Sequence, residues 1–243
     1  MTDNTAEKAE QAAPAAEDHF QGDWAEGYDA RVRCVIPAYE AMHNLVCVVL
    51  DRALADTANV LAVGSGTGTE LARLGALHPG WRFTGVDPAP AMMAIARRRI
   101  ADAGLEARVT LHEGALEELP PGEPFDAATL LLVLQFLPDD GTKLALLRGI
   151  AQRLKPGGAL VMYDGHGDKA SPEHRENMEL WKAYAVHSGL ERQYVENELE
   201  ARRERVQFVT EERSLALLEE AGFGPVERFC KAFHFDGWIA PRR

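Results

Sequence analysis

A run of alternating glycines constrains this chain more than any other feature. Gly64, Gly66 and Gly68 follow an apolar, β-branched run at residues 59–63, and a helical pattern begins directly after them. Glycine lacks a Cβ and tolerates positive φ, so this strand-to-helix turn can bring bare backbone close to a ligand. A second apolar run ends in Asp87, and a carboxylate at the tip of a neighbouring strand can accept hydrogen bonds from both hydroxyls of a ribose. Together the turn and the acid predict a site for a nucleoside-containing cofactor.

The spacing of the glycines narrows the choice of cofactor. The dinucleotide-binding fingerprint needs a third glycine where this chain has Thr69, and the phosphate-binding loop of ATPases needs a Gly-Lys-Ser/Thr sequence that is absent here. The remaining G-x-G-x-G pattern resembles motif I of the class I S-adenosylmethionine (SAM) methyltransferases. A turn that serves only as a tight connection is the structural alternative.

Composition and charge limit the classes of partner. The 243 residues, 46% of them hydrophobic, suit one α/β domain with a full core. The formal net charge of −12 repels phosphate backbones and argues against nucleic acid as a partner. Two basic clusters, residues 97–99 and 202–205, stand in helical patterns beside acidic residues and are interpreted as solvated helix faces. The three cysteines lack metal or redox spacing, and no membrane-length apolar run or signal peptide is visible, so we expect a cytoplasmic protein with no membrane partner.

The first quarter of the chain divides into a tail and a helical part. Residues 1–18 are rich in Ala, Glu, Gln and Pro and predict a disordered tail. Residues 19–56 predict a helical cap and a first long helix, with a break near Pro37 and the long helix running over 39–55.

The rest of the chain, residues 57–243, alternates strands and helices and predicts the cofactor-binding domain. Alternation of this kind produces right-handed crossovers and a doubly wound, mostly parallel sheet, here of seven strands. A helical insertion at 172–204 follows the fifth strand, and the last two apolar runs predict an antiparallel pair. Strands are expected at 59–63, 82–86, 108–112, 126–134, 158–164, 225–231 and 233–240, and helices at 69–77, 90–103, 142–154 and 211–221.

Several motifs in this order resemble the class I methyltransferase family, whose fold is Rossmann-like, from about Phe20 to Ile239. They are Phe125-Asp126-Ala127-Ala128, Leu154-Lys155-Pro156-Gly157-Gly158 and Glu220-Ala221-Gly222-Phe223. More narrowly, the chain resembles the carboxy-SAM synthases, which add a carboxylate carbanion, derived from prephenate, to the SAM methyl group. That resemblance is carried by Ile36-Pro37-Ala38-Tyr39, Leu134-Gln135-Phe136-Leu137 and Phe233-His234-Phe235.

Three positions depart from the pattern that the resemblance implies. Ala62 replaces the acid that usually stands two residues before the first glycine and helps to hold the methionine amino group. Ala115 replaces the acid that usually receives the adenine amino group, so that either the backbone of Leu116 holds the ring or Glu113 or Glu117 substitutes for the acid. Leu131 stands where the synthases have an asparagine, and Arg203, or Arg202, is the nearest match to their carboxylate-binding arginine.

The cofactor residues follow partly from the motifs and partly from the resemblance. The turn should present main-chain N–H groups to SAM, Asp87 should accept from the ribose or else cap the next helix, and Met92 should pack on adenine or in the core. Cap residues should close the methionine end, with Arg33 either pairing with the SAM carboxylate or lying on the surface. The predicted cofactor-binding set is Tyr28, Arg33, Tyr39, Gly64, Ser65, Gly66, Asp87, Pro88, Met92, Ala115, Leu116, Leu131 and Gln135.

Candidate catalytic and substrate residues lie at the carboxyl edge of the expected sheet and in the insertion. Asp164 and His166 are candidate general bases, although a polar loop explains them equally, and the Asp-x-His-x-Asp spacing matches no familiar metal frame, so no metal is expected. Tyr184 is a third catalytic candidate, and His187 and Arg203 are candidate substrate contacts. Tyr184 and His187 face either the substrate pocket or its hydrophobic packing.

Three hypotheses for function remain open at this stage. The first is a SAM-dependent methyltransferase acting on a small molecule, with homodimerisation through the cap and insertion. The second is a SAM-modifying enzyme without a methyl acceptor, either carboxy-SAM synthase-like or cyclising SAM with release of methylthioadenosine. The third is a non-catalytic SAM-binding protein.

Overall fold

The computed structural model describes residues 23–243, except for the side chains of 23, 24 and 198–204. The tail predicted at 1–18 therefore lies outside the described residues, as does Phe20. Within the described part, the element order follows the predicted alternation of strands and helices.

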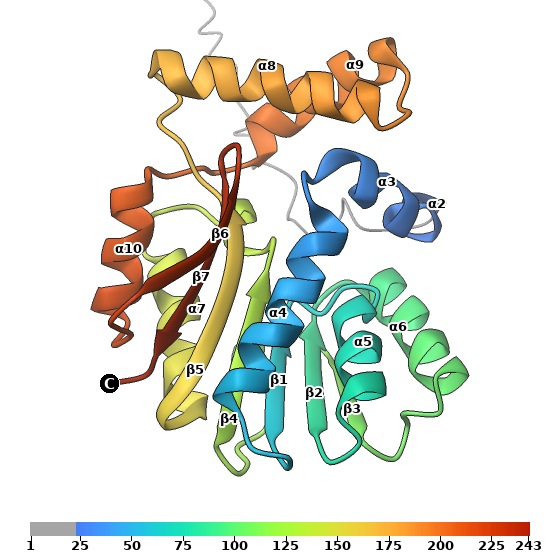
Figure 1. Cartoon of the computed structure of the whole chain (residues 1–243), viewed down its shortest axis with the longest axis vertical. Helices are drawn as coiled ribbons and strands as arrows, with labels where there is room; N and C mark the ends of the chain where they lie inside the picture. The colour runs from blue at the N-terminus through green and yellow to red at the C-terminus, as the bar shows by residue number, and fades with distance from the viewer. Residues whose placement is uncertain (1–22) are drawn as a thin grey trace, which may run out of the picture.

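A seven-stranded sheet forms the centre of the molecule (Figure 1). Its spatial order is β3-β2-β1-β4-β5-β7-β6, in which the first five strands of the chain run parallel and β7 pairs antiparallel with both β5 and β6. This arrangement confirms the predicted doubly wound sheet with a final antiparallel pair. The strands are β1 (Asn59–Val63), β2 (Arg82–Asp87), β3 (Val109–Glu113), β4 (Phe125–Leu131), β5 (Leu154–Gly165), β6 (Glu227–Ala232) and β7 (Phe235–Pro241).

Helices cover both faces of the sheet because its strands are apolar on both sides. Along β1, Val60 and Ala62 pack into one core cluster, and Leu61 and Val63 pack into the other, as the alternation of a strand requires. One face is covered by α4 (Tyr39–Ala53), α5 (Thr69–Leu77) and α6 (Pro90–Asp102), and the other by α7 (Thr142–Arg153) and α10 (Glu211–Glu220).

The central strands differ from the prediction at two ends. β4 ends at Leu131 rather than at residue 134, because Leu132 takes a left-handed φ of 62° and the chain turns into the short 3-10 helix η2 (Leu134–Phe136). β5 begins at Leu154 and includes the predicted turn at 155–158, with an irregular register between Phe125 and Ala127. The first difference matters for the site, because it brings η2 over the strand ends. A second 3-10 helix, η1 (Leu116–Glu118), follows β3.

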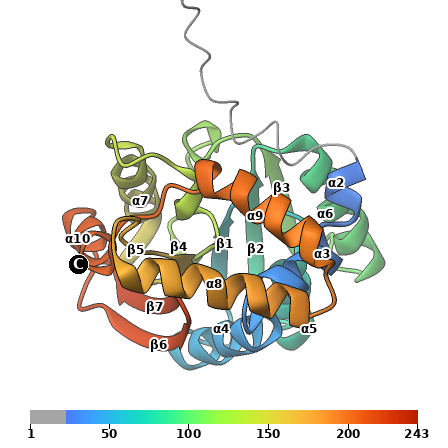
Figure 2. The same cartoon turned by 90° about the horizontal axis from the view of Figure 1, so that it is seen from above.

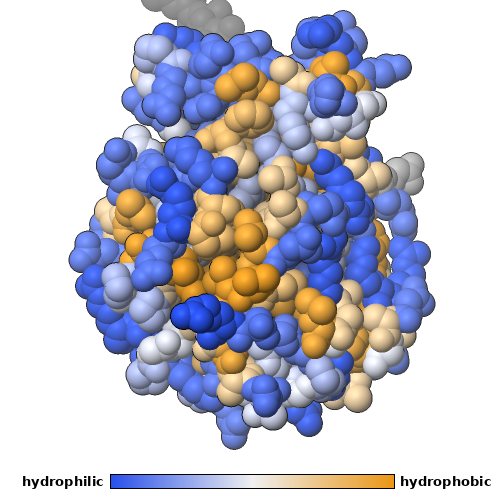
Figure 3. Space-filling view, viewed as in Figure 1, coloured by the Kyte–Doolittle hydropathy of each residue, from blue (hydrophilic) through white to orange (hydrophobic). Residues whose placement is uncertain are grey.

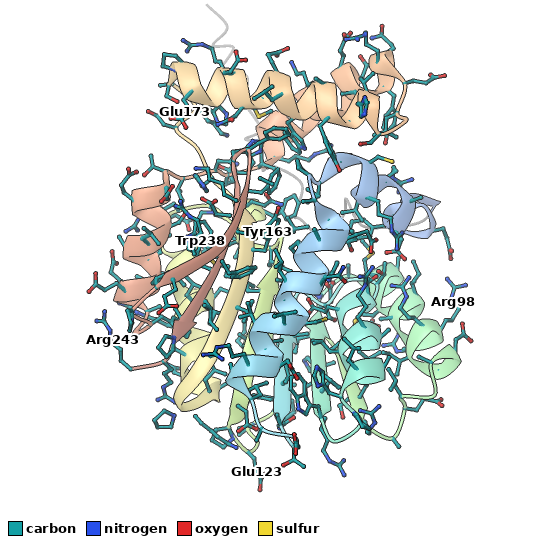
Figure 4. The ribbon with its side chains drawn as sticks, in the orientation of Figure 1. Arg98, Glu123, Tyr163, Glu173, Trp238 and Arg243 are labelled. Atoms are coloured by element: carbon teal, nitrogen blue, oxygen red, sulfur yellow. The ribbon has the colours of Figure 1, made fainter. Side chains whose placement is uncertain are left out.

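A helical cap lies over the carboxyl ends of β1 and β2. It consists of α2 (Asp23–Glu26) and α3 (Tyr28–Val35), and it breaks before α4 at Ala38, whose φ is 57°. The Tyr163 hydroxyl, on the central strand β5, donates to the Pro37 carbonyl at 3.2 Å and fixes this break (Figure 4). The break near Pro37 is therefore as predicted.

The insertion crosses the top of the sheet above the cap. It consists of α8 (Pro172–His187) and α9 (Arg192–Arg205), which lie across the carboxyl ends of the strands when seen from above (Figure 2). The Trp181 Nε1 atom of α8 donates to the Val35 carbonyl of α3, and the Cys34 thiol approaches the Ser188 carbonyl at 3.3 Å. Cap and insertion therefore form one cover over the strand ends.

The arginines of α6 are paired rather than free. Arg97 pairs with Glu113 at 2.7 Å, Arg98 with Glu26 at 2.7 Å, and Arg99 with Asp29 of the cap. Each charge is thus balanced by an acid, and two of the three pairs hold the cap to α6; Arg98 is labelled in Figure 4.

One face of the molecule carries apolar surface. Figure 3 shows it as an orange region across the middle of the view, and on α4 Leu45 and Val48 are 37% and 64% exposed. Within residues 23–243 no single helix is long and apolar enough to cross a membrane, although α3 and α4 together reach that length and composition with a 92° bend between them.

Candidate active site

A cavity of about 160 Å³ lies at the carboxyl ends of β1, β2 and β4. This is where the strand order reverses between β1 and β4, the usual ligand position in a doubly wound sheet. Its lining combines the glycine turn after β1, the end of β2, the start of α6 and the turn after β4. The lining residues are Tyr28, Gly64, Gly66, Asp87, Pro88, Ala89, Met92, Leu131, Leu132, Val133, Phe136 and Leu137.

Asp87 joins the end of β2 to the glycine turn. One carboxylate oxygen accepts from the Gly66 N–H at 2.8 Å, and the other accepts from the Ala89 N–H at 2.9 Å. Burial raises the pKa of this carboxyl group, while the two N–H donors oppose that shift. The same carboxylate lines the cavity, so each oxygen retains a lone pair for a ligand hydroxyl.

The glycines are required for two different reasons. Gly64 has φ of +69°, a conformation that residues with a side chain rarely adopt. A Cβ there would also stand 2.2 Å from the Val133 Cγ2 atom, so there is no space for a side chain. Gly66 has φ of +51°, and a Cβ there would meet nothing within 4 Å. Gly66 therefore requires glycine for its backbone conformation and leaves open space in front of the turn.

The wall opposite Asp87 is apolar. Met92 comes from α6, while Leu131, Val133 and Phe136 come from the end of β4 and η2. The early end of β4 places these side chains at the cavity. An apolar slot with a carboxylate at one end suits a purine ring and its ribose.

A second, smaller cavity of about 40 Å³ continues from the first beneath the cap. The two share Tyr28, Gly64, Gly66 and the end of β4, and the smaller one adds a polar set. That set comprises Tyr39 and His43 of α4, Ser65 and Thr67 of the turn, and Thr69 and Glu70 of α5.

Glu70, His43 and Tyr39 are buried titratable groups of the smaller cavity, and burial raises the pKa of the Tyr39 phenol to about 12. Glu70 is 6% exposed, accepts from the Thr129 hydroxyl at 2.8 Å, and has its pKa raised to about 7 by burial. Burial lowers the pKa of His43 to about 4, and its Nε2 atom is buried without a hydrogen-bond partner among the residues that the structure describes. The smaller cavity therefore holds a carboxyl group and a neutral imidazole.

The raised pKa of Glu70 predicts a pH-dependent effect on stability. A carboxyl group whose pKa rises from 4.5 to about 7 on folding destabilises the fold increasingly as the pH rises through that interval. We expect ligand-free Glu70→Gln to gain stability over the wild type as the pH rises from 5 to 8, by up to about 3 kcal/mol. The pKa of Asp164 is also raised to about 7, but Asp164 is present in both proteins. Its contribution therefore cancels from the difference in stability between the wild type and the variant. Urea denaturation at the two pH values measures the difference, and parallel pH curves would contradict the prediction.

These residues fit SAM. Its ribose needs an acceptor such as Asp87, its adenine needs the apolar slot, and its amino-acid part needs buried polar groups. The larger cavity supplies the first two and the adjoining cavity the third.

Several known proteins to which the chain is similar are methyltransferases or enzymes that modify SAM. Residues 61–160 match a family described as "Methyltransferase domain". Over 233 residues the chain is 28% identical to carboxy-S-adenosyl-L-methionine synthase of Klebsiella pneumoniae (strain 342), covering 90% of this chain and 91% of that protein. The fold matches an O-methyltransferase family protein from Burkholderia thailandensis (TM-score 0.62, 20% identity, 90% of this chain and 59% of that one). It also matches human N-acetylserotonin methyltransferase in complex with SAM (TM-score 0.58, 20% identity, 84% and 52%).

Together with the fold and the site, these similarities support a SAM-dependent transferase with the class I methyltransferase fold. The chain resembles the class I SAM-dependent methyltransferases, and its residues 61–160 match their methyltransferase domain.

The structure brings most of the predicted cofactor residues together. Those that line the two cavities are Tyr28, Tyr39, Gly64, Ser65, Gly66, Asp87, Pro88, Met92 and Leu131. Their contacts with SAM remain predictions, since the geometry shows only that they share the site.

Arg33, Ala115, Leu116 and Gln135 are placed outside the lining of both cavities. Arg33 pairs with Glu40 at 2.7 Å and donates to the Asp29 carbonyl, half-exposed on the cap. Leu116 packs in the core beside α7, and the Ala115 N–H donates to the Glu118 carboxylate at 2.8 Å. Gln135 is buried, and its Oε1 atom is without a partner.

Asp164 is placed on the side of β5 that faces away from α4. Its two oxygens accept from the N–H groups of Leu134, Gln135 and Gly165 at 2.7, 3.1 and 2.8 Å. Lys143 lies nearby and donates to the Leu134 carbonyl at 2.6 Å. These contacts position the turn after β4, whereas the role of a general base stays a prediction.

His166 belongs to an ion-pair network beside α10. Its Nε2 atom lies 2.5 Å from buried Asp236, and Glu211 completes a cluster of possible ligand atoms within 4.8 Å of one another. Arg228 pairs with both carboxylates, and Lys231 lies 3.9 and 4.0 Å from them. The cations already balance the two acids of this cluster.

The remaining candidates lie on the insertion. The Tyr184 ring packs edge-on against Phe233, with centroids 6.3 Å apart, and His187 ends α8. Arg203 lies in α9, and its side chain is outside the described residues.

Proposed function

We propose that the protein transfers the methyl group of SAM to a small, apolar acceptor bound beneath the cap and the insertion. The observation that carries this proposal is the apolar character of the cavity at the strand ends, where Leu131, Val133 and Phe136 line the same space as the glycine turn and Asp87. Among the described residues that line the two cavities there is no lysine, arginine or asparagine. A neutral acceptor suits such a wall, because burying an unpaired charge against it is costly.

Leu131 separates this proposal from carboxy-SAM synthesis. The synthases that the chain resembles have an asparagine at this position and handle a carboxylate reagent. A leucine cannot donate a hydrogen bond to a carboxylate, so the same reaction would leave that anion poorly paired. The substitution therefore favours a neutral acceptor.

The residues of the chain supply binding, alignment and exclusion of water. When bound, SAM supplies an electrophilic methyl group on a sulfonium. Asp87 and the glycine turn hold the nucleoside end, and the buried polar set beneath the cap holds the methionine end. Helices α8 and α9 lie over the strand ends (Figure 2), and a dry, aligned site accelerates an in-line displacement.

Carboxy-SAM synthesis is the second candidate, and one observation favours it. The 28% identity to the Klebsiella pneumoniae synthase extends over nine-tenths of both proteins. An apolar leucine at the end of β4 is the observation against it.

Mass spectrometry of reaction products tests the two candidates. Purified protein is incubated with SAM and a panel of apolar phenols, amines and thiols, and separately with SAM and prephenate. We expect S-adenosylhomocysteine and a methylated acceptor in the first arm, with Asp87→Ala as the control that forms neither. Carboxy-SAM in the second arm would replace the proposal with the second candidate. Methylthioadenosine from SAM alone, above its spontaneous rate, would exclude both.

A further inference from the structure

The missing acid at Ala62 leaves the SAM ammonium group without its usual partner. Ala62 is buried in β1 and pairs in register with Thr129 of β4. Paired residues of parallel strands point to the same face of the sheet, so the Thr129 hydroxyl lies beside the place that a longer side chain at 62 would fill. A polar position on this face therefore remains, although the acid is absent.

The carboxylate of Glu70 reaches this position from another element. Glu70 lies in the first turn of α5, which packs on the same face, and its Oε1 atom accepts from the Thr129 hydroxyl at 2.8 Å. The small side chain of Ala62 leaves room for it. Glu70 of α5 thus places a carboxyl group beside the pair of β1 and β4, where β1 has Ala62 in place of the usual acid.

Glu70 also lacks a cation. Within the part of the chain that the structure describes, no lysine, arginine or histidine forms an ion pair with it, and its one side-chain donor is Thr129. It lines the smaller cavity, and so does His43, whose Nε2 atom is buried and unpartnered. A buried carboxylate with an open cavity before it is a binding site for a cationic group.

We propose that Glu70 replaces the missing acid and binds the ammonium group of the SAM methionine moiety, with Thr129 as its positioning residue. The inference rests on SAM binding and not on which group is transferred, so failure of the methyl-transfer proposal leaves it standing. The ammonium supplies the charge partner that the described residues do not. A ligand without the amino group gains nothing from Glu70.

Calorimetric titration of Glu70→Gln with three ligands tests the proposal. Glutamine keeps the shape and an acceptor for Thr129 but removes the charge. We expect the affinity for SAM and for S-adenosylhomocysteine to fall about 10- to 100-fold, the range for a charge-assisted hydrogen bond. We expect the affinity for methylthioadenosine, which has no amino-acid part, to change by less than about twofold, which also shows that the nucleoside site is folded.

Control and rescue variants make the outcome decisive. Glu106→Gln removes the same charge at an exposed position and should leave all three affinities unchanged. Ala62→Asp in a Glu70→Ala background returns an acid to the strand and should restore most of the SAM affinity that Glu70→Ala loses. An equal loss of SAM and methylthioadenosine binding in Glu70→Gln would mean a structural role, and unchanged SAM binding would remove Glu70 from the site. Either result overturns the proposal.

Discussion

Replacing Asp87 by alanine is expected to lower the affinity for SAM by two to three orders of magnitude. The carboxylate faces the cavity at the end of β2, where it can accept from both ribose hydroxyls. Each charge-assisted hydrogen bond contributes about 1.5–3 kcal/mol, and two of them account for a change of this size. Isothermal titration with SAM and with S-adenosylhomocysteine measures it.

The structure adds a second consequence to the same substitution. Asp87 accepts from the Gly66 and Ala89 N–H groups, so alanine also leaves one donor at the glycine turn and one before α6 without an acceptor. We expect the thermal midpoint of the ligand-free protein to fall as well. Asp87→Asn keeps one acceptor oxygen and should lie between the wild type and alanine in both measurements. Full SAM affinity in Asp87→Ala, together with lost stability, would mean that the carboxylate only organises the turn.

The fold was predictable because its signals are local. Alternating glycines after a β-branched run specify a strand, a tight turn and a helix, and β1 and α5 begin within a residue or two of the expected positions. The order of strands and helices then leaves a doubly wound sheet as the natural topology. The end of β4 was one exception, since the left-handed backbone at Leu132 has no signal in a leucine, and the start of β5 at Leu154 was another.

The nucleoside end of the site followed from the same local signals, whereas the methionine end did not. Asp87 and the glycines are found by their spacing along the chain. Glu70 was missed because a lone acid at the start of an amphipathic helix looks like an ordinary first-turn residue. Its role depends on Thr129, which is distant in sequence and joins it only through the pairing of β1 with β4. His43 was missed for a similar reason, because it sits on the buried face of a long helix.

For the catalytic candidates, a position at the end of a strand was not enough to predict which side chains face the cavity. The carboxyl edge of the sheet was the right place to search, but residues at the end of β5 alternate between two faces. Tyr163 packs toward the cap, whereas Asp164 accepts from the turn after β4. A sequence pattern such as Asp-x-His-x-Asp does not reveal which face opens onto the cavity.

Replacing Asp164 by alanine is expected to destabilise the ligand-free protein by about 3–5 kcal/mol, because each buried donor left without its acceptor costs about 1–3 kcal/mol. The substitution leaves three backbone N–H groups without their acceptor and Lys143 without its nearby carboxyl group. Urea denaturation at pH 5 measures the free energy of unfolding, because above the raised pKa of about 7 ionisation of the buried carboxyl group itself costs stability and would offset the loss.

Asp168→Ala is the matched control for this prediction because Asp168 belongs to the same sequence motif. It is exposed, and its carboxylate accepts only from the nearby Ala170 N–H at 2.9 Å among the contacts that the structure describes, so its loss should cost less than about 1 kcal/mol. Because Asp164 holds the turn that carries Val133 and Phe136, its alanine variant should also bind SAM more weakly. A variant with wild-type stability and SAM affinity that no longer forms product would instead place Asp164 at the reacting atoms, as the general-base hypothesis requires.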